Sequence, residues 1–221
     1  MRESQVFERV RQSGVVAVLV IDRAEDAVPL AEALLAGGVD VMELTLRTPV
    51  ALAAVEAVRK QVPAMLAGVG TILTPEQVRQ VVDVGGAFGV APGMNPRVVE
   101  EAFRLGLPFG PGICTPSDIE RALEFDCRTL KFFPAEPSGG LAYLQSIAAP
   151  YAHLGVKYVP LGGVSEANMG SYLKDASIAA VGGSWIATRS AIQAQDWAGI
   201  SATARRAITV RDAVRAGKGS A

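Results

Sequence analysis

The feature that most limits the fold of this chain is a regular alternation of short apolar runs with amphipathic stretches. Eight runs rich in Val, Ile, Leu, Ala and Gly have the length of strands, and they lie at residues 14–21, 39–46, 64–71, 87–92, 107–113, 129–135, 156–163 and 178–184. The stretches between several of them carry apolar residues at helical spacing. Strands that are apolar throughout and alternate with helices form parallel sheets covered on both faces. The pattern therefore predicts an α/β protein.

Helix-start signals divide the chain further. A Thr-Pro or Asn-Pro pair, typical of a helix start, stands at residues 48–49, 74–75, 95–96 and 115–116, and Asp22 and Ser165 are further candidates. Eight strands, each followed by a helix, predict one (β/α)8 TIM barrel domain over residues 1–221. The first dozen residues predict an extra N-terminal helix that closes the bottom of this barrel. An open doubly wound sheet is the alternative, but no GxGxxG follows the first strand and no P-loop occurs.

Charge and composition exclude several classes of partner. The chain has 21 basic and 22 acidic residues without long runs of one sign, so neither nucleic acid nor an anionic membrane is an expected partner. Its apolar runs are too short to span a bilayer, and its first residues do not have the pattern of a secretory leader. Cys114 and Cys127 are expected to be free thiols, and a single histidine, His153, cannot build a zinc site. We expect no metal and no cofactor.

If the chain is a barrel, its chemistry belongs at the ends of the strands, where the loops that lead into the helices gather. Side chains alternate along a strand, so Val41, Glu43 and Thr45 share one face and Met42 and Leu44 the other. The same alternation places Thr129, Lys131 and Phe133 on one face. If both faces point inward, Glu43 and Lys131 enter the interior together.

A lysine in such a strand needs an explanation, because an ammonium group removed from water loses several kcal/mol of hydration. Lys131 either extends to solvent or serves as a neutral amine, which can attack a carbonyl group to form a Schiff base. The protonated imine draws electrons from a neighbouring C–C bond without any metal, and Glu43 is the candidate proton shuttle. A structural ion pair is the alternative, although buried ion pairs seldom stabilise a fold.

The ends of the other strands suggest how a substrate is held. Arg47 is placed at the rim above Glu43, where it is either a ligand for an anion or a solvated charge. The third strand ends in GVGT, with Thr71 last and two glycines that permit close approach. The last two strands end in Gly162-Gly163 and Gly182-Gly183-Ser184, where barrels commonly bind phosphate through backbone N–H groups. These positions predict a phosphorylated substrate.

Five motifs in this order carry a resemblance to a known family. ELTLRTP (43–49), GVGT (68–71), KFFPAE (131–136), PLGGV (160–164) and VGGSW (181–185) resemble those of the KDPG/KHG aldolases, and the similarity runs from about Gly14 to Arg206. These class I aldolases cleave 2-keto-3-deoxy-6-phosphogluconate (KDPG) or 4-hydroxy-2-oxoglutarate (KHG) and release pyruvate. The resemblance implies a cytoplasmic homotrimer that acts on a small 2-keto acid in the Entner–Doudoroff route.

The resemblance also assigns roles to residues. It implies that Lys131 forms the Schiff base and that Glu43 is the general acid and base. The substrate-binding residues it implies are Arg47 and Thr71 at the pyruvate carboxylate, Pro92 and Phe133 along the pocket, and Gly162, Gly163, Gly182, Gly183 and Ser184 at the phosphate. Leu161 stands where these aldolases usually have a threonine thought to help read the stereochemistry of a substrate hydroxyl, so the aldehyde half of the substrate stays open.

Two other functions fit the same residues. In another phosphate-binding barrel enzyme without covalent catalysis, such as an isomerase or a relative of thiamine-phosphate synthase, Lys131 would only neutralise an anion. In a non-catalytic binding protein for sugar-acid phosphates, the same pocket would hold its ligand unchanged. Reduction with borohydride in the presence of pyruvate separates these functions, because only the Schiff-base enzyme retains a stable adduct on the lysine.

Overall fold

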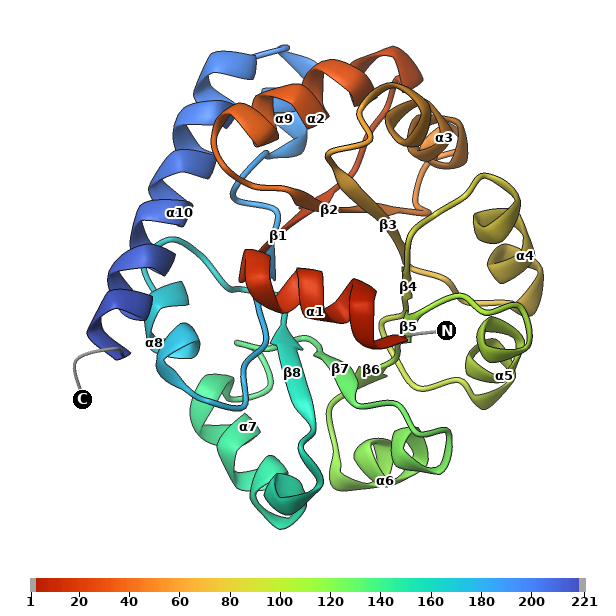
Figure 1. The fold of residues 1–221 in the computed structure, drawn as a ribbon, viewed down its shortest axis with the longest axis vertical. Coiled ribbons are helices and arrows are strands. Elements are labelled where there is room, and N and C mark those ends of the chain that lie inside the picture. The colour runs from red at the N-terminus through yellow and green to blue at the C-terminus, as the bar shows by residue number, and fades with distance from the viewer. Residues whose placement is uncertain (1–2, 219–221) are drawn as a thin grey trace.

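The computed structural model describes residues 3–218, and within them nine strands alternate with helices (Figure 1). The strands are β1 (Val15–Leu19), β2 (Val41–Thr45), β3 (Leu66–Gly70), β4 (Gly89–Val90), β5 (Phe109–Gly110), β6 (Gly112–Ile113), β7 (Thr129–Phe132), β8 (Lys157–Pro160) and β9 (Val181–Gly183). The helices are α1 (Glu3–Ser13), α2 (Ala27–Ala36), α3 (Ala51–Gln61), α4 (Pro75–Asp83), α5 (Pro96–Arg104), α6 (Pro116–Glu124), α7 (Gly140–Ala148), α8 (Met169–Lys174), α9 (Arg189–Gln193) and α10 (Trp197–Lys218), with the 3-10 turns η1 (Ala24–Asp26) and η2 (Ala149–Leu154). Every predicted strand contains an observed one.

All paired strands run parallel, and they form two sheets that curl around a common centre with the helices outside (Figure 1). One sheet has the order β5-β4-β3-β2-β1-β9 and the other the order β6-β7-β8. The predicted strand at 107–113 is divided at Pro111, which has no N–H to donate to a neighbouring strand. The hydrogen bonds therefore define an α/β fold with a parallel, curled sheet rather than one closed ring.

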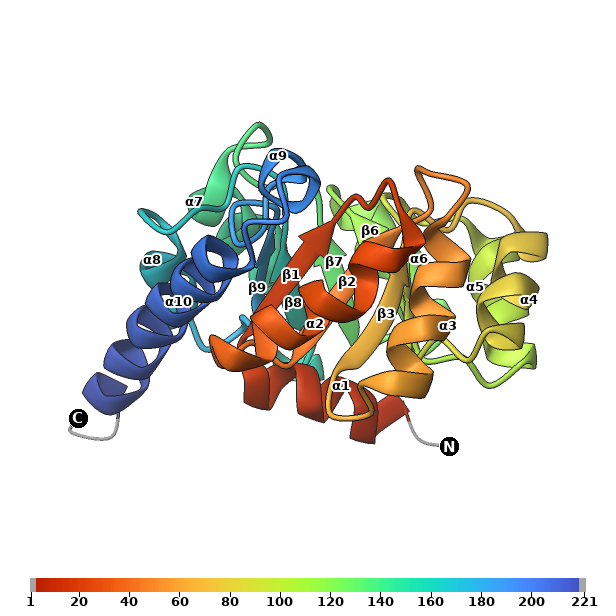
Figure 2. The same cartoon turned by 90° about the horizontal axis from the view of Figure 1, so that it is seen from above.

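The core has two layers, and the alternation along the strands separates them. Met42 and Leu44 of β2 pack in the large cluster between the strands and the helices. Val41, on the opposite face, belongs to a smaller interior cluster with Phe88 and with Phe7 of α1. Helix α1 lies across the end of the sheet where the strands begin (Figure 2). The predicted extra N-terminal helix is confirmed, and it closes the interior from below.

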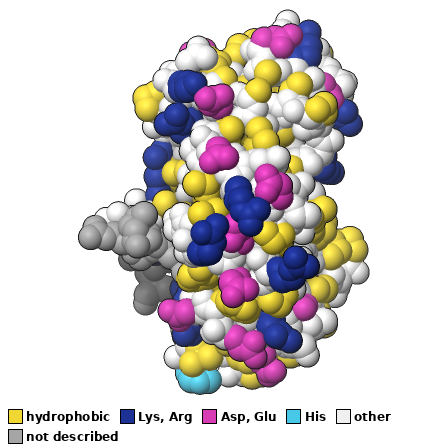
Figure 3. Space-filling model, turned by 90° about the vertical axis from the view of Figure 1, so that its right-hand side faces the viewer, with side chains coloured by type: hydrophobic (Ala, Val, Ile, Leu, Met, Phe, Trp, Pro, Cys, Tyr) yellow, Lys and Arg dark blue, Asp and Glu magenta, His cyan; other side chains and the backbone are white. Residues whose placement is uncertain are grey.

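The outer surface carries mixed charges. Over α4 and α5, acidic and basic side chains lie among apolar ones (Figure 3). The carboxylate of Glu101 accepts hydrogen bonds from Arg79 Nε and Arg104 Nε, both at 2.7 Å. Of the helices within residues 3–218, none combines the length and the apolar character that a bilayer crossing requires.

Candidate active site

Lys131 and Glu43 meet in the interior, although 88 positions separate them in the sequence. Lys131 Nζ donates a hydrogen bond to Glu43 Oε1 at 2.9 Å, and both residues are buried, with exposures of 7% and 2%. The Lys131 ammonium also lies 5.7 Å from the centre of the Phe133 ring. The lysine therefore does not escape to solvent. Two of the residues that carry the predicted chemistry are in direct contact.

Glu43 fits beside Lys131 because the neighbouring strand has no side chain at the point of contact. Strand β3 pairs with β2, with Gly70 opposite Thr45. A Cβ atom at Gly70 would overlap the Glu43 carboxylate. The GVGT sequence thus leaves the space that the carboxylate occupies.

A cavity of about 310 Å³ opens above this pair at the ends of the strands. It is lined by all but one of the predicted site residues, namely Glu43, Arg47, Thr71, Pro92, Lys131, Phe133, Leu161, Gly162, Gly163, Gly183 and Ser184. Gly182 is the exception: a Cβ there would approach the side chains of Leu161 and Val18, which themselves line the cavity. Val18, Thr45 and Val164 complete the lining, and the sequence analysis did not predict that they belong to the site.

Two lining residues of the cavity stand out: Arg47 by its lack of an ion pair among the described residues, and Thr71 by its backbone conformation. Arg47 Nε donates to Thr45 Oγ1 at 3.2 Å, and Thr45 Oγ1 donates to the carbonyl of Leu19 at 2.9 Å. No ion pair of Arg47 is found among the described residues, so its guanidinium is available to an anion. Thr71 has a φ of 63°, which costs a β-branched residue about 1–3 kcal/mol and typically occurs at functional sites.

The glycine pair after β8 is packed against the loop that follows β7. Gly162 and Gly163 have φ values of 92° and 85°, which side-chain-bearing residues rarely adopt. A Cβ at Gly163 would collide with Glu136, whose own N–H donates to the carbonyl of Gly162 at 2.9 Å. The backbone of this turn is therefore fixed by its neighbour, while Ser184, on the next strand end, is exposed at the cavity.

A hydrogen bond between Tyr172 and Glu136 holds the loop that follows β7, and the sequence analysis did not predict it. Tyr172 of α8 is buried and donates its hydroxyl to Glu136 Oε1. Burial, together with this hydrogen bond, raises the pKa of Tyr172, which keeps the hydroxyl protonated as the donor. Glu136 is the last residue of KFFPAE, so its place in the motif was the signal that could have indicated a role.

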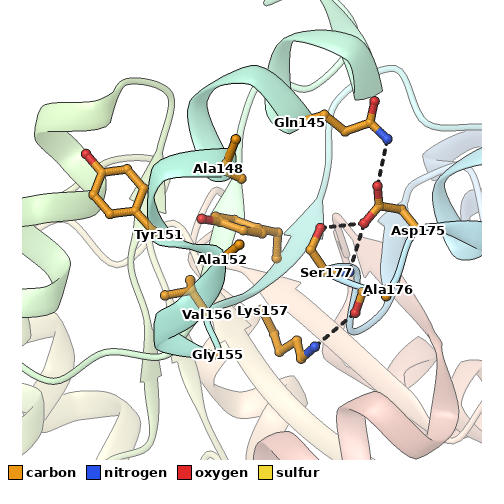
Figure 4. A pocket seen from close by; sticks show the side chains of 12 residues that line it. Gln145, Ala148, Tyr151, Ala152, Gly155, Val156, Lys157, Asp175, Ala176 and Ser177 are labelled. Carbon is orange, nitrogen blue, oxygen red and sulfur yellow. Dashed lines mark hydrogen bonds between the residues drawn. The ribbon is translucent and has the colours of Figure 1, made fainter.

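A hollow of about 350 Å³ on the outside of the molecule has no comparable chemistry. It lies between α7, η2, β8 and the loop after α8 (Figure 4). Two of its polar side chains bond to Asp175: Gln145 Nε2 donates to Asp175 Oδ2 at 2.7 Å, and Ser177 Oγ donates to Asp175 Oδ1 at 2.6 Å. Neither Lys131 nor Glu43 lines this hollow, so it is separate from the candidate active site.

Within residues 3–218, no group of three or more His, Cys, Asp or Glu side chains is arranged to hold a metal ion. Neither Cys114 nor Cys127 takes part in a disulfide among the described residues, and His153 is exposed.

A buried lysine bonded to a glutamate, under a cavity at the ends of parallel strands, defines a class of enzyme that works through covalent imine chemistry. The sequence profile described as "KDPG and KHG aldolase" matches residues 6–203. The chain belongs to the KDPG and KHG aldolase family.

Individual relatives agree with this assignment. The chain is 42% identical to the 2-dehydro-3-deoxy-phosphogluconate aldolase of Treponema pallidum, over 93% of this chain and 97% of that protein. It is 41% identical to the KHG/KDPG aldolase of Escherichia coli K12, over 88% of this chain and 90% of that one. Among solved structures, it superposes with a TM-score of 0.87 on the KDPG aldolase of Legionella pneumophila with pyruvate captured as a covalent carbinolamine, at 37% identity over 92% of this chain and 98% of that one.

Proposed function

We propose that this protein is a class I aldolase that cleaves KDPG to pyruvate and glyceraldehyde 3-phosphate. The observation that carries the proposal is the buried hydrogen bond between Lys131 Nζ and Glu43 Oε1 in a chain of this family. The bond lets the lysine transfer its proton to the carboxylate, which leaves a neutral amine inside the site. A relative captured with pyruvate as a carbinolamine supports the same covalent route.

The reaction follows from the position of these two groups. The neutral amine of Lys131 attacks the C2 carbonyl of KDPG to give a carbinolamine. Glu43 then gives the proton it received from Lys131 to the departing hydroxyl, so that water leaves and the protonated imine and a Glu43 carboxylate remain. Glu43 takes the proton of the C4 hydroxyl, the C3–C4 bond breaks, and its electrons move to the imine nitrogen as glyceraldehyde 3-phosphate leaves. Glu43 then returns the proton to C3 of the enamine, and water hydrolyses the new imine to release pyruvate and the free lysine.

We assign the two ends of the substrate to two groups of predicted site residues. Arg47 and Thr71 would hold the pyruvate carboxylate, with Pro92 and Phe133 beside it; all four line the cavity. Backbone N–H groups at Gly162, Gly163, Gly182 and Gly183, with the Ser184 hydroxyl, would bind the phosphate. A cavity of about 310 Å³ is of the size that holds a small metabolite.

KHG is the second substrate that this site would accept. Its cleavage to pyruvate and glyoxylate needs the same lysine and the same carboxylate but no phosphate contact. The name of the Escherichia coli relative, KHG/KDPG aldolase, supports this dual activity. Leu161, buried against the cavity, presents only an apolar surface to the aldehyde half.

We also propose that the two sheets are the two parts of one (β/α)8 barrel in a single domain over residues 1–221. The isolated bridge between Tyr158 of β8 and Ile178, just before β9, supports closure on one side, and the direct continuation of β5 into β6 through Pro111 supports it on the other. The resemblance to the family supports a homotrimer that acts in the cytoplasm in the Entner–Doudoroff route, without a cofactor.

Pyruvate release from KDPG tests the proposed function. Lys131→Ala should abolish cleavage while the fold survives, because the interior loses an amine rather than a packing group. Lys60→Ala is the matched control, since Lys60 lies on α3 and its Nζ pairs with Glu56 at 2.6 Å, outside the active-site cavity. Normal turnover by Lys131→Ala would favour the enzyme without covalent catalysis, and no turnover by the unaltered protein would favour a binding protein.

A further inference from the structure

A cationic hollow of about 330 Å³ lies at the opposite end of the molecule from the active site. It is lined by residues from α1, α8 and the loop after it, the start of β8 and the last turns of α10. In Figure 1, α1 crosses in front of the strands, and α8 and α10 lie outside them on the left. Three arginines and a lysine line it: Arg11, Arg211, Arg215 and Lys157. Its apolar wall includes Leu173, Ile178 and Val214. The hollow thus combines a positive rim with an apolar floor.

Two of these arginines have a structural role, because they bind the C-terminal end of α1. Arg211 Nη1 donates to the carbonyl of Ser13 at 2.8 Å, and Arg215 donates from Nη1 to Gln12 at 2.7 Å and from Nη2 to Arg11 at 2.9 Å. They thereby satisfy the last carbonyls of α1, where the helix dipole is negative. Gly14 makes room, because a Cβ there would lie 2.7 Å from Arg215 Nη2.

The four cations of the hollow outnumber the carboxylates that pair with them. Arg11 pairs with Glu8 at 2.5 Å, and Arg211 pairs with Asp212 at 2.7 Å. Within residues 3–218, Arg215 and Lys157 have no carboxylate partner. Lys157 Nζ donates only to the carbonyl of Ala176 at 2.9 Å (Figure 4). Two cations that line the hollow therefore have no ion pair of their own among the described residues, although the charge of Asp212 acts on Arg215.

The surroundings of Arg215 are unfavourable to its charge. Partial burial of this exposed side chain lowers the pKa of Arg215, and the charges of Arg211 and Arg11 lower it further, whereas the charge of Asp212 acts in the opposite direction. Crowding of like charges is costly when nothing neutralises it, and a bound anion would relieve that cost. Two cations without a carboxylate partner match the charge of a phosphate monoester, which carries close to two negative charges at neutral pH.

We propose that this hollow binds a small organic phosphate, with its phosphate between Arg215 and Lys157 and its carbon part against Leu173, Ile178 and Val214. Guanidinium and ammonium groups both suit phosphate, because each offers charge-assisted hydrogen bonds. Arg211 and Arg215 lie beyond residues 6–203, the part of the chain that the family profile matches, whereas Arg11 and Lys157 lie within it. No residue lines both this hollow and the active-site cavity, so the hollow is separate from the active site.

Thermal shift and calorimetry with glycerol 3-phosphate, at constant ionic strength, test this site. Binding to the native state raises the unfolding temperature as the ligand concentration rises. The double variant Lys157→Met, Arg215→Met should bind the ester at least about tenfold more weakly, because charge-assisted hydrogen bonds are lost. The matched control is Arg205→Met on the same helix, whose Nη2 donates to the carbonyl of Ala36 away from the hollow.

The variants also separate this site from the active site, which is expected to bind phosphate as well. Ser184→Ala should leave the binding event that depends on Lys157 and Arg215 unchanged. Lys157→Met alone keeps the contacts between α10 and α1, so it carries the test if Arg215→Met fails to fold. Wild-type affinity in a folded hollow variant would overturn the proposal. Equal binding of inorganic phosphate and the ester, lost on adding salt, would indicate an adventitious ion only and would overturn it too.

Discussion

Glu43 is held beside Lys131 by a hydrogen bond of 2.9 Å and is almost fully buried, so its carboxylate is positioned before any substrate arrives. We expect Glu43→Gln to form the pyruvate imine slowly and to suppress proton exchange at the pyruvate methyl group by about 10²–10⁴-fold. Deuterium exchange followed by NMR measures this rate. Exchange at the normal rate would show that another group or a chain of waters moves the proton.

Gly70 determines whether this carboxylate can keep its place. A methyl group at Gly70 would overlap Glu43 Oε1, so Gly70→Ala should displace the carboxylate and slow methyl exchange toward the rate of Glu43→Gln. We expect a loss of stability of about 1–3 kcal/mol from overpacking. Gly170→Ala in α8, where a Cβ would meet only ordinary contacts at 3.5 Å, is the control. Unchanged exchange in Gly70→Ala would mean that the carboxylate has room elsewhere.

Leu161 is the residue at which this chain departs from the family pattern in the cavity. Leu161→Thr should sharpen the preference between the C4 epimers of the sugar acid, because threonine offers a hydroxyl where leucine offers a methyl surface. The value of kcat/KM for both epimers, in the wild type and the variant, measures the effect. Pyruvate exchange should stay constant. An unchanged epimer ratio would show that position 161 does not contact that hydroxyl.

At the scale of helices and strands, local chemistry predicted some boundaries and missed others. Thr74 and Thr115 each begin a helix with a reciprocal capping box, and Asn95 caps α5, as the sequence indicates. Thr48 does not cap α3, which starts at Ala51, because its hydroxyl donates to the carbonyl of Ile21 instead. Asp22 accepts hydrogen bonds from Arg189, 167 positions away. The side chains of Thr48 and Asp22 bond to residues far away in the sequence, and a local sequence pattern does not reveal such partners.

The contact between α4 and α5 gives the fold a dependence on pH. Hydrogen bonds from Arg104 and Arg79 lower the pKa of Glu101 to about 2 in the folded state. Above its ordinary pKa the carboxylate is charged in both states and the ion pairs stabilise the fold. As the pH falls, the unfolded chain takes up the proton first, so stability is lost from about pH 4.5 down toward pH 2.

We therefore expect Glu101→Gln to lose less stability than the wild type between pH 6 and pH 3. Urea unfolding at both pH values measures the difference. Glu124→Gln is the control, since its carboxylate is 3.5 Å from Arg121 and its side chain is 64% exposed. An equal loss in the wild type and Glu101→Gln would show that these ion pairs add nothing to the fold.

At the scale of the whole molecule, the sequence predicted which residues come together better than it predicted the closure of the sheet. Parallel strands end at the same edge, so a lysine and a glutamate on inward faces of β7 and β2 had to converge, and they did. The division at Pro111 depends on which strand each half pairs with, which periodicity does not reveal. The Tyr172–Glu136 pair and the arginines of α10 depend on contacts between distant segments, so they became visible only in the structure.

The Schiff base on Lys131 is the central claim, and one chemical experiment tests it most directly. The protein is incubated with pyruvate and borohydride, digested, and mapped by mass spectrometry. Of the five lysines in the chain, we expect the reduced pyruvate adduct on Lys131 alone, and no adduct in Lys131→Ala. An absence of adduct in the wild type, or an adduct on an exposed lysine with Lys131 unmodified, would contradict the covalent mechanism.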